Sequence, residues 1–161
     1  MVGIGAGVGA VPVGVMRTVY LVSCVSAKRP DPTPAQDLYH SPWFQKARAY
    51  VTGQMRTGNE WFILSAKHHL VAPDTVIAPY ELTLNRMLQP VRRQWSSTVM
   101  EALTPRLQAG DCVVFLAGAR YREYLEKEVA ARHCTVSVPM AGLAIGRQLQ
   151  WLSNALIGDR A

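Results

Sequence analysis

The sequence predicts an α/β domain with three layers, in which a central, mostly parallel sheet of about four strands carries helices on both faces. Four short apolar runs rich in β-branched residues indicate buried strands, and segments with helical spacing of apolar residues alternate with them. Strands that are apolar throughout are typical of parallel sheets, because helices cover both faces of such sheets. With 161 residues, the chain has room for one domain with one core.

The first fifteen residues, MVGIGAGVGAVPVGV, carry no charge and show no period. Gly5, Gly7 and Ala10 have the spacing of a dinucleotide-binding fingerprint, but that motif requires a strand before it and a helix after it. A proline and a glycine follow instead, and the basic region of a signal peptide is missing. We therefore expect residues 1–15 to form a flexible extension and residues 16–161 to form the single α/β domain.

The first predicted strand and helix lie in residues 18–53. The run TVYLVS at residues 18–23 is short, apolar and β-branched, which indicates a buried strand. Ser41 and Pro42 supply a helix N-cap and a proline at the first helical position. We expect that helix to end near Gly53.

A second strand and a long helix occupy the middle of the chain. The run EWFILS at residues 60–65 indicates the strand, and residues 67–80 have no clear period and predict a long loop. Apolar residues then recur at spacings of three and four from Leu88 to Leu107, with Pro90 near the start. This spacing predicts a long amphipathic helix.

Two further pairs of a strand and a helix complete the predicted fold. The runs CVVFLA at residues 112–117 and CTVSV at residues 134–138 indicate the third and fourth strands. Helical spacing of apolar residues follows each of them, at residues 121–129 and 145–156. Strands and helices therefore alternate along the whole domain.

The charge of the chain favours an anionic partner. There are 17 Lys and Arg against 11 Asp and Glu, a formal net charge of +6. A basic excess of this kind suits nucleic acid or a nucleotide. No apolar run reaches the roughly 20 residues that a membrane helix needs, so we expect no membrane partner. Nothing in the sequence indicates the oligomeric state.

The cysteines and glycines argue against metal and cofactor sites. The three cysteines, Cys24, Cys112 and Cys134, are odd in number and lack the short spacing of a disulfide framework or a zinc site. The segment from Gly142 to Arg147 is too short for a phosphate-binding loop and lacks its lysine. We expect no metal, no cofactor, and a reducing, cytoplasmic location.

The candidate site lies at the carboxyl ends of the predicted strands, because ligands of open parallel α/β sheets bind there. The residues that follow the strands, or lie in the loops beside them, are mostly small or polar. Four are candidates for catalysis: Cys24, Lys28, Lys67 and His68. Eight more are candidates for binding substrate: Ser23, Ser65, Tyr80, Gly118, Arg120, Tyr121, Gly142 and Arg147.

Lys28 and Lys67 each follow a Ser-Ala pair just beyond a strand. Two neighbouring ammonium groups favour an anion between them, and one of them can lose its proton and act as a nucleophile or base. The alternative is that both are solvated loop residues, as we expect for Lys46 on the solvated face of the first helix. Asp74 or Glu81, in the long middle loop, is a candidate acid or base.

The remaining candidates each have two interpretations. Cys24, at a strand-to-loop turn near a lysine, is either a thiolate nucleophile or a buried spacer. His68 suits a general base or a phosphate contact, and the adjacent His69 points in another direction. Arg120 and Tyr121 together can hold a phosphate and stack on a base, although Tyr121 also belongs to the apolar stripe of its helix.

Several motifs resemble those of one family. They include Ser-Cys-x-x-x-Lys at residues 23–28, Leu-Tyr-x-Ser at residues 38–41 and Ile-Leu-Ser-Ala-Lys-His at residues 63–68. With them the chain is identified, from about Val19 to Leu152, as a member of an uncharacterised bacterial and phage family of domains of unknown function. Members of that family usually carry Gly where this chain has His69.

A more distant similarity concerns the turn after the first strand. The Cys24-x-x-x-Lys28 spacing resembles the Cys-x-x-x-Lys motif of the archaeosine synthase catalytic domain, which attaches lysine to a deazaguanine base in transfer RNA. That motif continues with Pro-Tyr, whereas Arg29-Pro30-Asp31 follows here. The resemblance implies a uracil-DNA-glycosylase-like fold. The Ser-x-Ala-Lys pattern near the amino end is also faintly similar to the peroxide-stress DNA-binding protein family.

We therefore expect a nucleic-acid- or nucleobase-directed enzyme that modifies a base or cleaves its N-glycosidic bond. Lys28 and Lys67 would bind phosphate or base, and Cys24 or His68 would act as the nucleophile or move a proton. Two other classes stay open. One is a non-catalytic DNA-binding or damage-protection protein that uses the same basic edge, and the other is a small nucleotide-binding enzyme without a polymer substrate.

Overall fold

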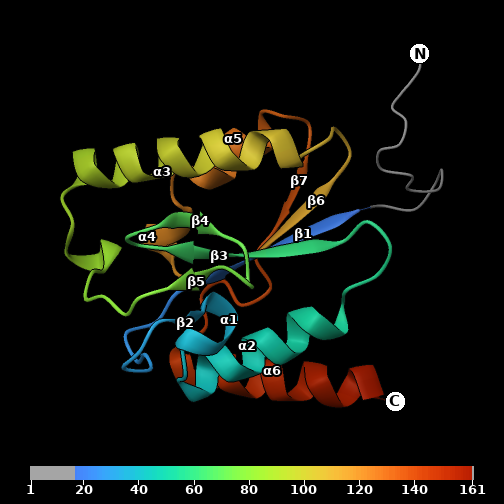
Figure 1. The fold of residues 1–161 in the computed structure, drawn as a ribbon. Coiled ribbons are helices and arrows are strands. Elements are labelled where there is room, and N and C mark those ends of the chain that lie inside the picture. Colours follow the sequence, from blue (N-terminus) through green and yellow to red (C-terminus); the bar gives the residue numbers. More distant parts are fainter. Residues whose placement is uncertain (1–16, 161) are drawn as a thin grey trace.

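A five-stranded sheet lies between two layers of helices in the computed structural model, which describes residues 17–160 (Figure 1). The expected flexible extension, residues 1–15, lies outside the described residues. The strands follow the order β4-β3-β1-β6-β7 across the sheet. Their bounds are Thr18–Ser23 for β1, Glu60–Ser65 for β3, His69–Val71 for β4, Cys112–Leu116 for β6 and Thr135–Ser137 for β7.

The four predicted strands are present and parallel. β1 lies at the centre and pairs with β3 on one side and β6 on the other, and β6 pairs with β7. Leu21 of β1 is opposite Phe62 and Phe115, and all three side chains are buried. The continuous apolar runs therefore correspond to strands covered on both faces, as expected for a parallel sheet.

The predicted long loop at residues 67–80 is wrong in part, because it contains two short strands. β4 returns antiparallel to β3 with Ser65 opposite His69, so the sheet gains a fifth strand at its edge. β5 (Val76–Ile77) pairs with β2 (Thr33–Pro34) in a separate two-stranded sheet. Strands of two or three residues are too short to produce a detectable period.

Two helices cover one face of the sheet, α2 (Pro42–Gly53) and α6 (Ile145–Arg160). Ser41 caps α2 as predicted, since its Oγ accepts a hydrogen bond of 3.1 Å from the Phe44 N–H. The Lys46 ammonium donates to Ser153 Oγ at 2.9 Å. The prediction that Lys46 lies on a solvated face is therefore wrong, because α6 packs against that side of α2. The short helix α1 (Ala35–Leu38) precedes α2.

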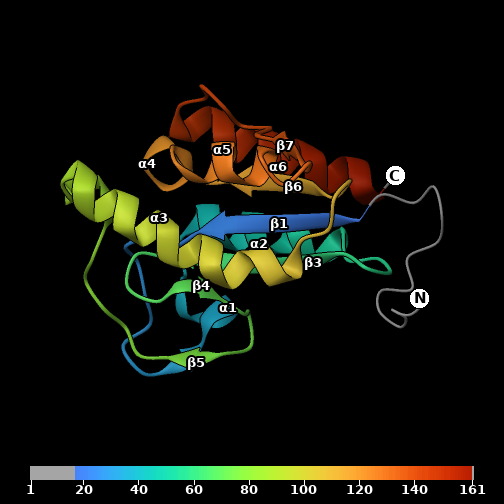
Figure 2. The same ribbon diagram turned by 90° about the horizontal axis from the view of Figure 1, so that it is seen from above.

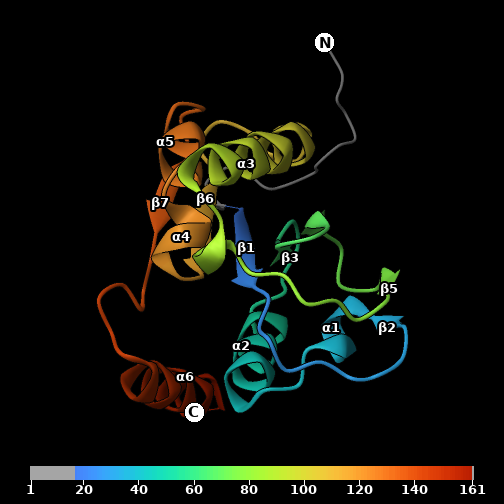
Figure 3. The same ribbon diagram turned by 90° about the vertical axis from the view of Figure 1, so that its left-hand side faces the viewer.

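The other face is covered by α3 (Gln89–Leu103), α4 (Ala119–Arg122) and α5 (Leu125–Ala130), as Figure 3 shows. The predicted helix at residues 88–107 is shorter, because a 3-10 turn at Thr104–Arg106 that contains a proline ends it. The single helix predicted at residues 121–129 is divided into α4 and α5. A further 3-10 turn, η1, precedes α3 at Leu84–Arg86.

The chain changes direction in the sheet between β1 and β6. From β1 it continues to β3 on one side, and from there it returns across the sheet to β6 on the other side of β1. The connections run on opposite faces, with α2 on one and α3 on the other (Figure 2). Such a switch point opens a crevice beyond the carboxyl ends of the two strands, where ligands of α/β sheets bind.

Candidate functional site

A cavity of about 800 Å³ opens at this switch point. We call it the switch-point cavity. Its walls come from the turn after β1, the segment Tyr80–Met87, and the start of α4. Half of the twelve predicted site residues line it: Ser23, Cys24, Lys28, Tyr80, Gly118 and Tyr121.

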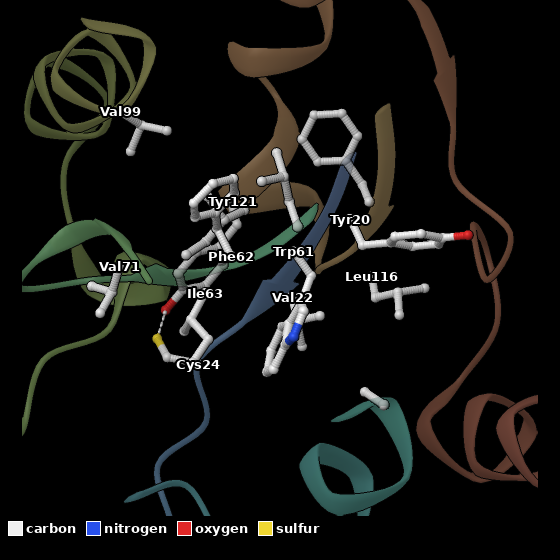
Figure 4. Packing of buried hydrophobic residues seen from close by; sticks show 14 of the residues in the cluster. Tyr20, Val22, Cys24, Trp61, Phe62, Ile63, Val71, Val99, Leu116 and Tyr121 are labelled. Carbon is white, nitrogen blue, oxygen red and sulfur yellow. Dashed lines mark hydrogen bonds between the residues drawn. The ribbon is translucent and has the colours of Figure 1, made fainter. Parts of the chain in front are cut away.

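Cys24 lies at the floor of the cavity and is held by the sheet. Its N–H donates to the Leu64 carbonyl at 3.0 Å, which extends the pairing of β1 with β3 by one residue. Its Sγ lies 3.5 Å from the Tyr121 Oη (Figure 4). The Tyr121 oxygen also accepts a hydrogen bond of 3.4 Å from the Leu84 N–H. Because burial raises the pKa of Tyr121, the phenol keeps its proton at neutral pH and can donate it to the sulfur.

Lys28 reaches the cavity from a loop that the backbone fixes in place. The backbone of Lys28 pairs with that of Tyr39 in an isolated antiparallel β-bridge. The ammonium lies 4.4 Å from the centre of the Tyr80 ring and 5.6 Å from that of Tyr39, within the range of cation–π attraction. Among the salt bridges of residues 17–160, none involves Lys28. Burial lowers the pKa of Lys28, and the nearby Cys24 and Glu81 act in the opposite direction.

A network of buried hydroxyl groups supports the Tyr80 ring beneath Lys28. The Tyr80 Oη lies 2.6 Å from the Tyr39 Oη and 2.7 Å from the Ser65 Oγ. Burial raises the pKa of Tyr39 to about 12 and raises that of Tyr80 as well. Both phenols are therefore neutral at physiological pH, and the network fixes the ring without adding charge.

Ser65 also organises the turn that carries Lys67 and His68. Its Oγ accepts hydrogen bonds from the backbone N–H groups of His68 at 2.9 Å and Lys67 at 3.3 Å. Both side chains are exposed, and neither lines the switch-point cavity. The His68 ring meets the Tyr80 ring edge-on at 5.6 Å. Burial lowers the pKa of His68, and Lys67 and His69 add to this effect, so its imidazole is neutral at pH 7.

The two predicted lysines thus lie at the same edge of the sheet, since β1 and β3 are parallel neighbours. Of the two, only Lys28 faces the switch-point cavity. That both ammonium groups hold one anion stays a prediction.

The remaining predicted residues lie outside this cavity. Arg120 is exposed on α4 and approaches Glu123 at 3.7 Å. Arg147 is exposed in the first turn of α6. Gly142 lines a smaller cavity of about 230 Å³, which adjoins the first at Gly118. Of the two carboxylate candidates, Glu81 lines the switch-point cavity, whereas Asp74 lies in an exposed turn before β5.

Sequence reasoning missed Tyr39, Trp95 and Arg86. Tyr39 belongs to the Leu-Tyr-x-Ser motif, which was a signal for it. Trp95 was assigned only to the apolar stripe of its helix, yet its Nε1 donates to the Ser65 carbonyl at 2.9 Å. Arg86 lines the switch-point cavity from η1, and no pattern in the sequence indicates the course of that turn.

Within residues 17–160, no three His, Cys, Asp or Glu side chains come together in a group that could hold a metal ion. In the same part of the chain, no helix has the length and apolar character needed to cross a membrane.

Comparisons with known proteins identify the family. No solved structure matches the chain significantly. An uncharacterized protein of Bacillus subtilis (strain 168), YfjM, is 28% identical over 155 residues, which cover 88% of this chain and 96% of YfjM. Residues 19–154 match the family of unknown function DUF6884, and the chain therefore belongs to that family.

Proposed function

We propose that this protein is an enzyme that acts on a nucleobase, either in a nucleotide or in nucleic acid, by modifying the base or cleaving its N-glycosidic bond. The observation that carries the proposal is the meeting of three reactive groups at the switch point. The Cys24 thiol, the Lys28 amine and the Tyr121 phenol all line one cavity.

The size and charge of the switch-point cavity suit a nucleotide. Its volume of about 800 Å³ lies within the roughly 300–1,000 Å³ typical of small-molecule sites. Lys28 and Arg86 line it and can bind phosphate, and Asn85 and Thr83 add hydrogen-bonding groups. The net charge of +6 also favours an anionic substrate.

The state of these groups favours catalysis over simple binding. Burial lowers the pKa of Lys28, so its ammonium group holds its proton less tightly than a lysine in water. Tyr121 places a proton-bearing phenol beside the Cys24 sulfur. In N-glycosidic cleavage the bond between C1′ and the base nitrogen breaks, water supplies the hydroxyl group of C1′, and the remaining proton goes to the base. Groups that hold and move protons at this position are what that reaction requires.

The resemblance of the Cys24-x-x-x-Lys28 turn to archaeosine synthase supports a base as the target. The finer fold assignment, a uracil-DNA-glycosylase-like arrangement, is part of the same proposal. Lys28 would then bind phosphate or base, and Cys24 would act as the nucleophile or carry a proton.

The test compares Lys28→Ala with Lys127→Ala. Lys127 is exposed on α5 and does not line the switch-point cavity, which makes it a matched control. Binding of nucleoside monophosphates and single-stranded oligonucleotides is measured by calorimetry at several salt concentrations. Lys28→Ala should weaken binding about tenfold or more and lower the salt slope for oligonucleotides by about one unit, whereas Lys127→Ala should do neither.

Turnover is followed by chromatography and mass spectrometry, which detect a released base or a changed base mass. Binding without any product across the panel would favour a non-catalytic DNA-binding or protection protein. Equal binding by both variants and the wild type would exclude Lys28 from the site and overturn the proposal.

A further inference from the structure

A second cavity, of about 420 Å³, meets the switch-point cavity from the other face of the sheet. Pro42 and Trp43 at the start of α2 form one wall, and Ile145 and Leu149 at the start of α6 form the other. We call it the apolar groove. Its lining differs from that of the switch-point cavity, because it contains neither Lys28 nor Arg86.

The two cavities adjoin at the switch point. Ser23, Cys24, Val25 and Gly118 line both of them. Three of these residues follow the end of β1 or complete it, and Gly118 lies just beyond β6. Cys24 and Gly118 therefore lie at the boundary between the two cavities.

The polar groups of the apolar groove bond to one another or to the backbone. The Trp43 Nε1 donates to the Gln148 Oε1 at 2.9 Å, and the Gln148 Nε2 donates to the Leu143 carbonyl at 2.8 Å. These bonds fix the indole ring and occupy the amide that could otherwise bind a polar ligand. Ile145, at the mouth, is an apolar side chain that is 61% exposed. The surface that remains suits contact with the face of a flat aromatic ring.

Gly118 leaves open space where the cavities join. A Cβ placed there would meet no protein atom within 4 Å, and its φ of −69° and ψ of 165° are accessible to any residue. The backbone does not require glycine at this position. The missing side chain leaves this space free at the boundary that both cavities share.

We propose that the apolar groove binds the base of the substrate and that the switch-point cavity binds its sugar and phosphate. The N-glycosidic bond then lies beside Cys24 and Gly118. This inference rests on the proposed function and specifies it, because it assigns each half of a nucleotide to one cavity. Together the two cavities offer an apolar surface for the face of a base and cationic groups for a phosphate.

The test measures binding of the base and binding of the sugar phosphate with separate compounds. Adenosine and uridine carry a base without phosphate, and ribose 5-phosphate carries phosphate without a base. Binding of each is measured by calorimetry, and stacking of the nucleosides in the groove is followed by quenching of Trp43 fluorescence, with Trp43→Phe to identify its share. Ile145→Arg tests the groove, and Ile157→Arg is the matched control because Ile157 is 66% exposed on the same helix and lines neither cavity.

Ile145→Arg should weaken nucleoside binding by about tenfold, or about 1.4 kcal/mol, and leave ribose 5-phosphate binding unchanged. Lys28→Ala should weaken ribose 5-phosphate binding and leave nucleoside binding unchanged. Ile157→Arg should change the binding of neither ligand. Nucleotide binding that depends on Lys28 but not on Ile145 would overturn this inference and leave the proposed function standing. Failure of the wild-type protein to bind any nucleotide or nucleoside would overturn the proposed function, and the inference with it.

Discussion

The two ends of the sheet hold their charged groups in different ways. At the amino ends of the strands, Arg17 bonds to Glu60 at 3.0 Å and to Asp111 at 3.1 Å, and Arg106 bonds to Glu60 at 3.1 Å. At the carboxyl ends, the Lys28 side chain lies against aromatic rings, and its ammonium group donates a hydrogen bond to the Ser26 carbonyl at 3.3 Å.

The charged groups at the amino ends are paired with one another, whereas Lys28 at the carboxyl ends is free to bind a ligand. A buried ion that has lost its partner is costly, so removing one partner from a paired cluster such as that of Arg17 should destabilise the fold. A partly buried ammonium group without a carboxylate partner has hydrogen-bond donors left for an anion. Removing a charged partner of Arg17 at the amino ends should therefore lower stability, whereas removing Lys28 at the carboxyl ends should weaken binding with little loss of stability.

The largest expected effect is that of Asp111→Ala. Asp111 is 5% exposed, and its carboxylate accepts hydrogen bonds from Arg17 and from the Gln108 N–H at 2.8 Å. Its removal leaves Arg17 only partly paired and should lower the free energy of unfolding by about 3 kcal/mol. Urea denaturation measures this loss. Lys28→Ala should cost less than about 1 kcal/mol, and similar losses for the two variants would remove the contrast between the ends.

The buried phenols near the carboxyl ends of the strands should make the free energy of unfolding depend on pH in the alkaline range. The ordinary pKa of tyrosine is 10.0, and burial raises that of Tyr39 to about 12. Between these values the unfolded chain loses the proton while the folded protein keeps it, so stability should fall as the pH rises from about 10 to about 12.

Urea denaturation across this range compares the wild type with Tyr39→Phe, which lacks the ionising group. The variant should lose about 2–3 kcal/mol less than the wild type over the interval, because a shift of two pKa units corresponds to about that energy. The same pH slope in both proteins would show that Tyr39 titrates as it does in water.

The smallest expected effects concern two histidines with left-handed backbone, one at each end of the sheet. His69 has a φ of 67° and His133 a φ of 61°. Replacing either by Gly removes strain of about 1 kcal/mol but increases the entropy of the unfolded chain, so stability should change by less than about 1 kcal/mol. Val at either position should be clearly destabilising. If thermal denaturation shows that Val is tolerated as well as Gly, the backbone at that position is not strained.

The parts of the fold that could be predicted are those with a local pattern in the sequence. The four parallel strands are predicted because each is a continuous apolar run covered on both faces, as at Leu21. The edge strand β4 depends on its pairing with β3, which no local pattern indicates. The end of α3 at Leu103 was missed because the apolar repeat continues to Leu107, although Pro105 lies between them.

The site was predictable where it depends on the strand ends. Cys24 follows β1 directly and Lys28 lies in the loop after it, so the rule for parallel sheets places them correctly at the switch point. Lys67 comes sooner after its strand β3, in a tight turn bonded to the Ser65 hydroxyl, and its side chain is exposed and outside the cavity. Arg86 belongs to a loop whose course is set by contacts distant in the sequence, such as that of Leu84 with Tyr121.

The central claim is that the ligand crosses the switch point between β1 and β6, and Gly118→Val tests it most directly. The valine side chain would enter the open space at the boundary of the two cavities, with no atom of a non-adjacent residue within 4 Å of its Cβ. Calorimetric titration with a nucleoside monophosphate, alongside thermal denaturation, gives the decisive comparison. Binding should weaken about tenfold or more, whereas stability should fall by only about 1 kcal/mol, because Gly118 is the N-cap of α4 and valine is a poorer N-cap than glycine. Undiminished nucleotide binding by a stably folded Gly118→Val protein would contradict it.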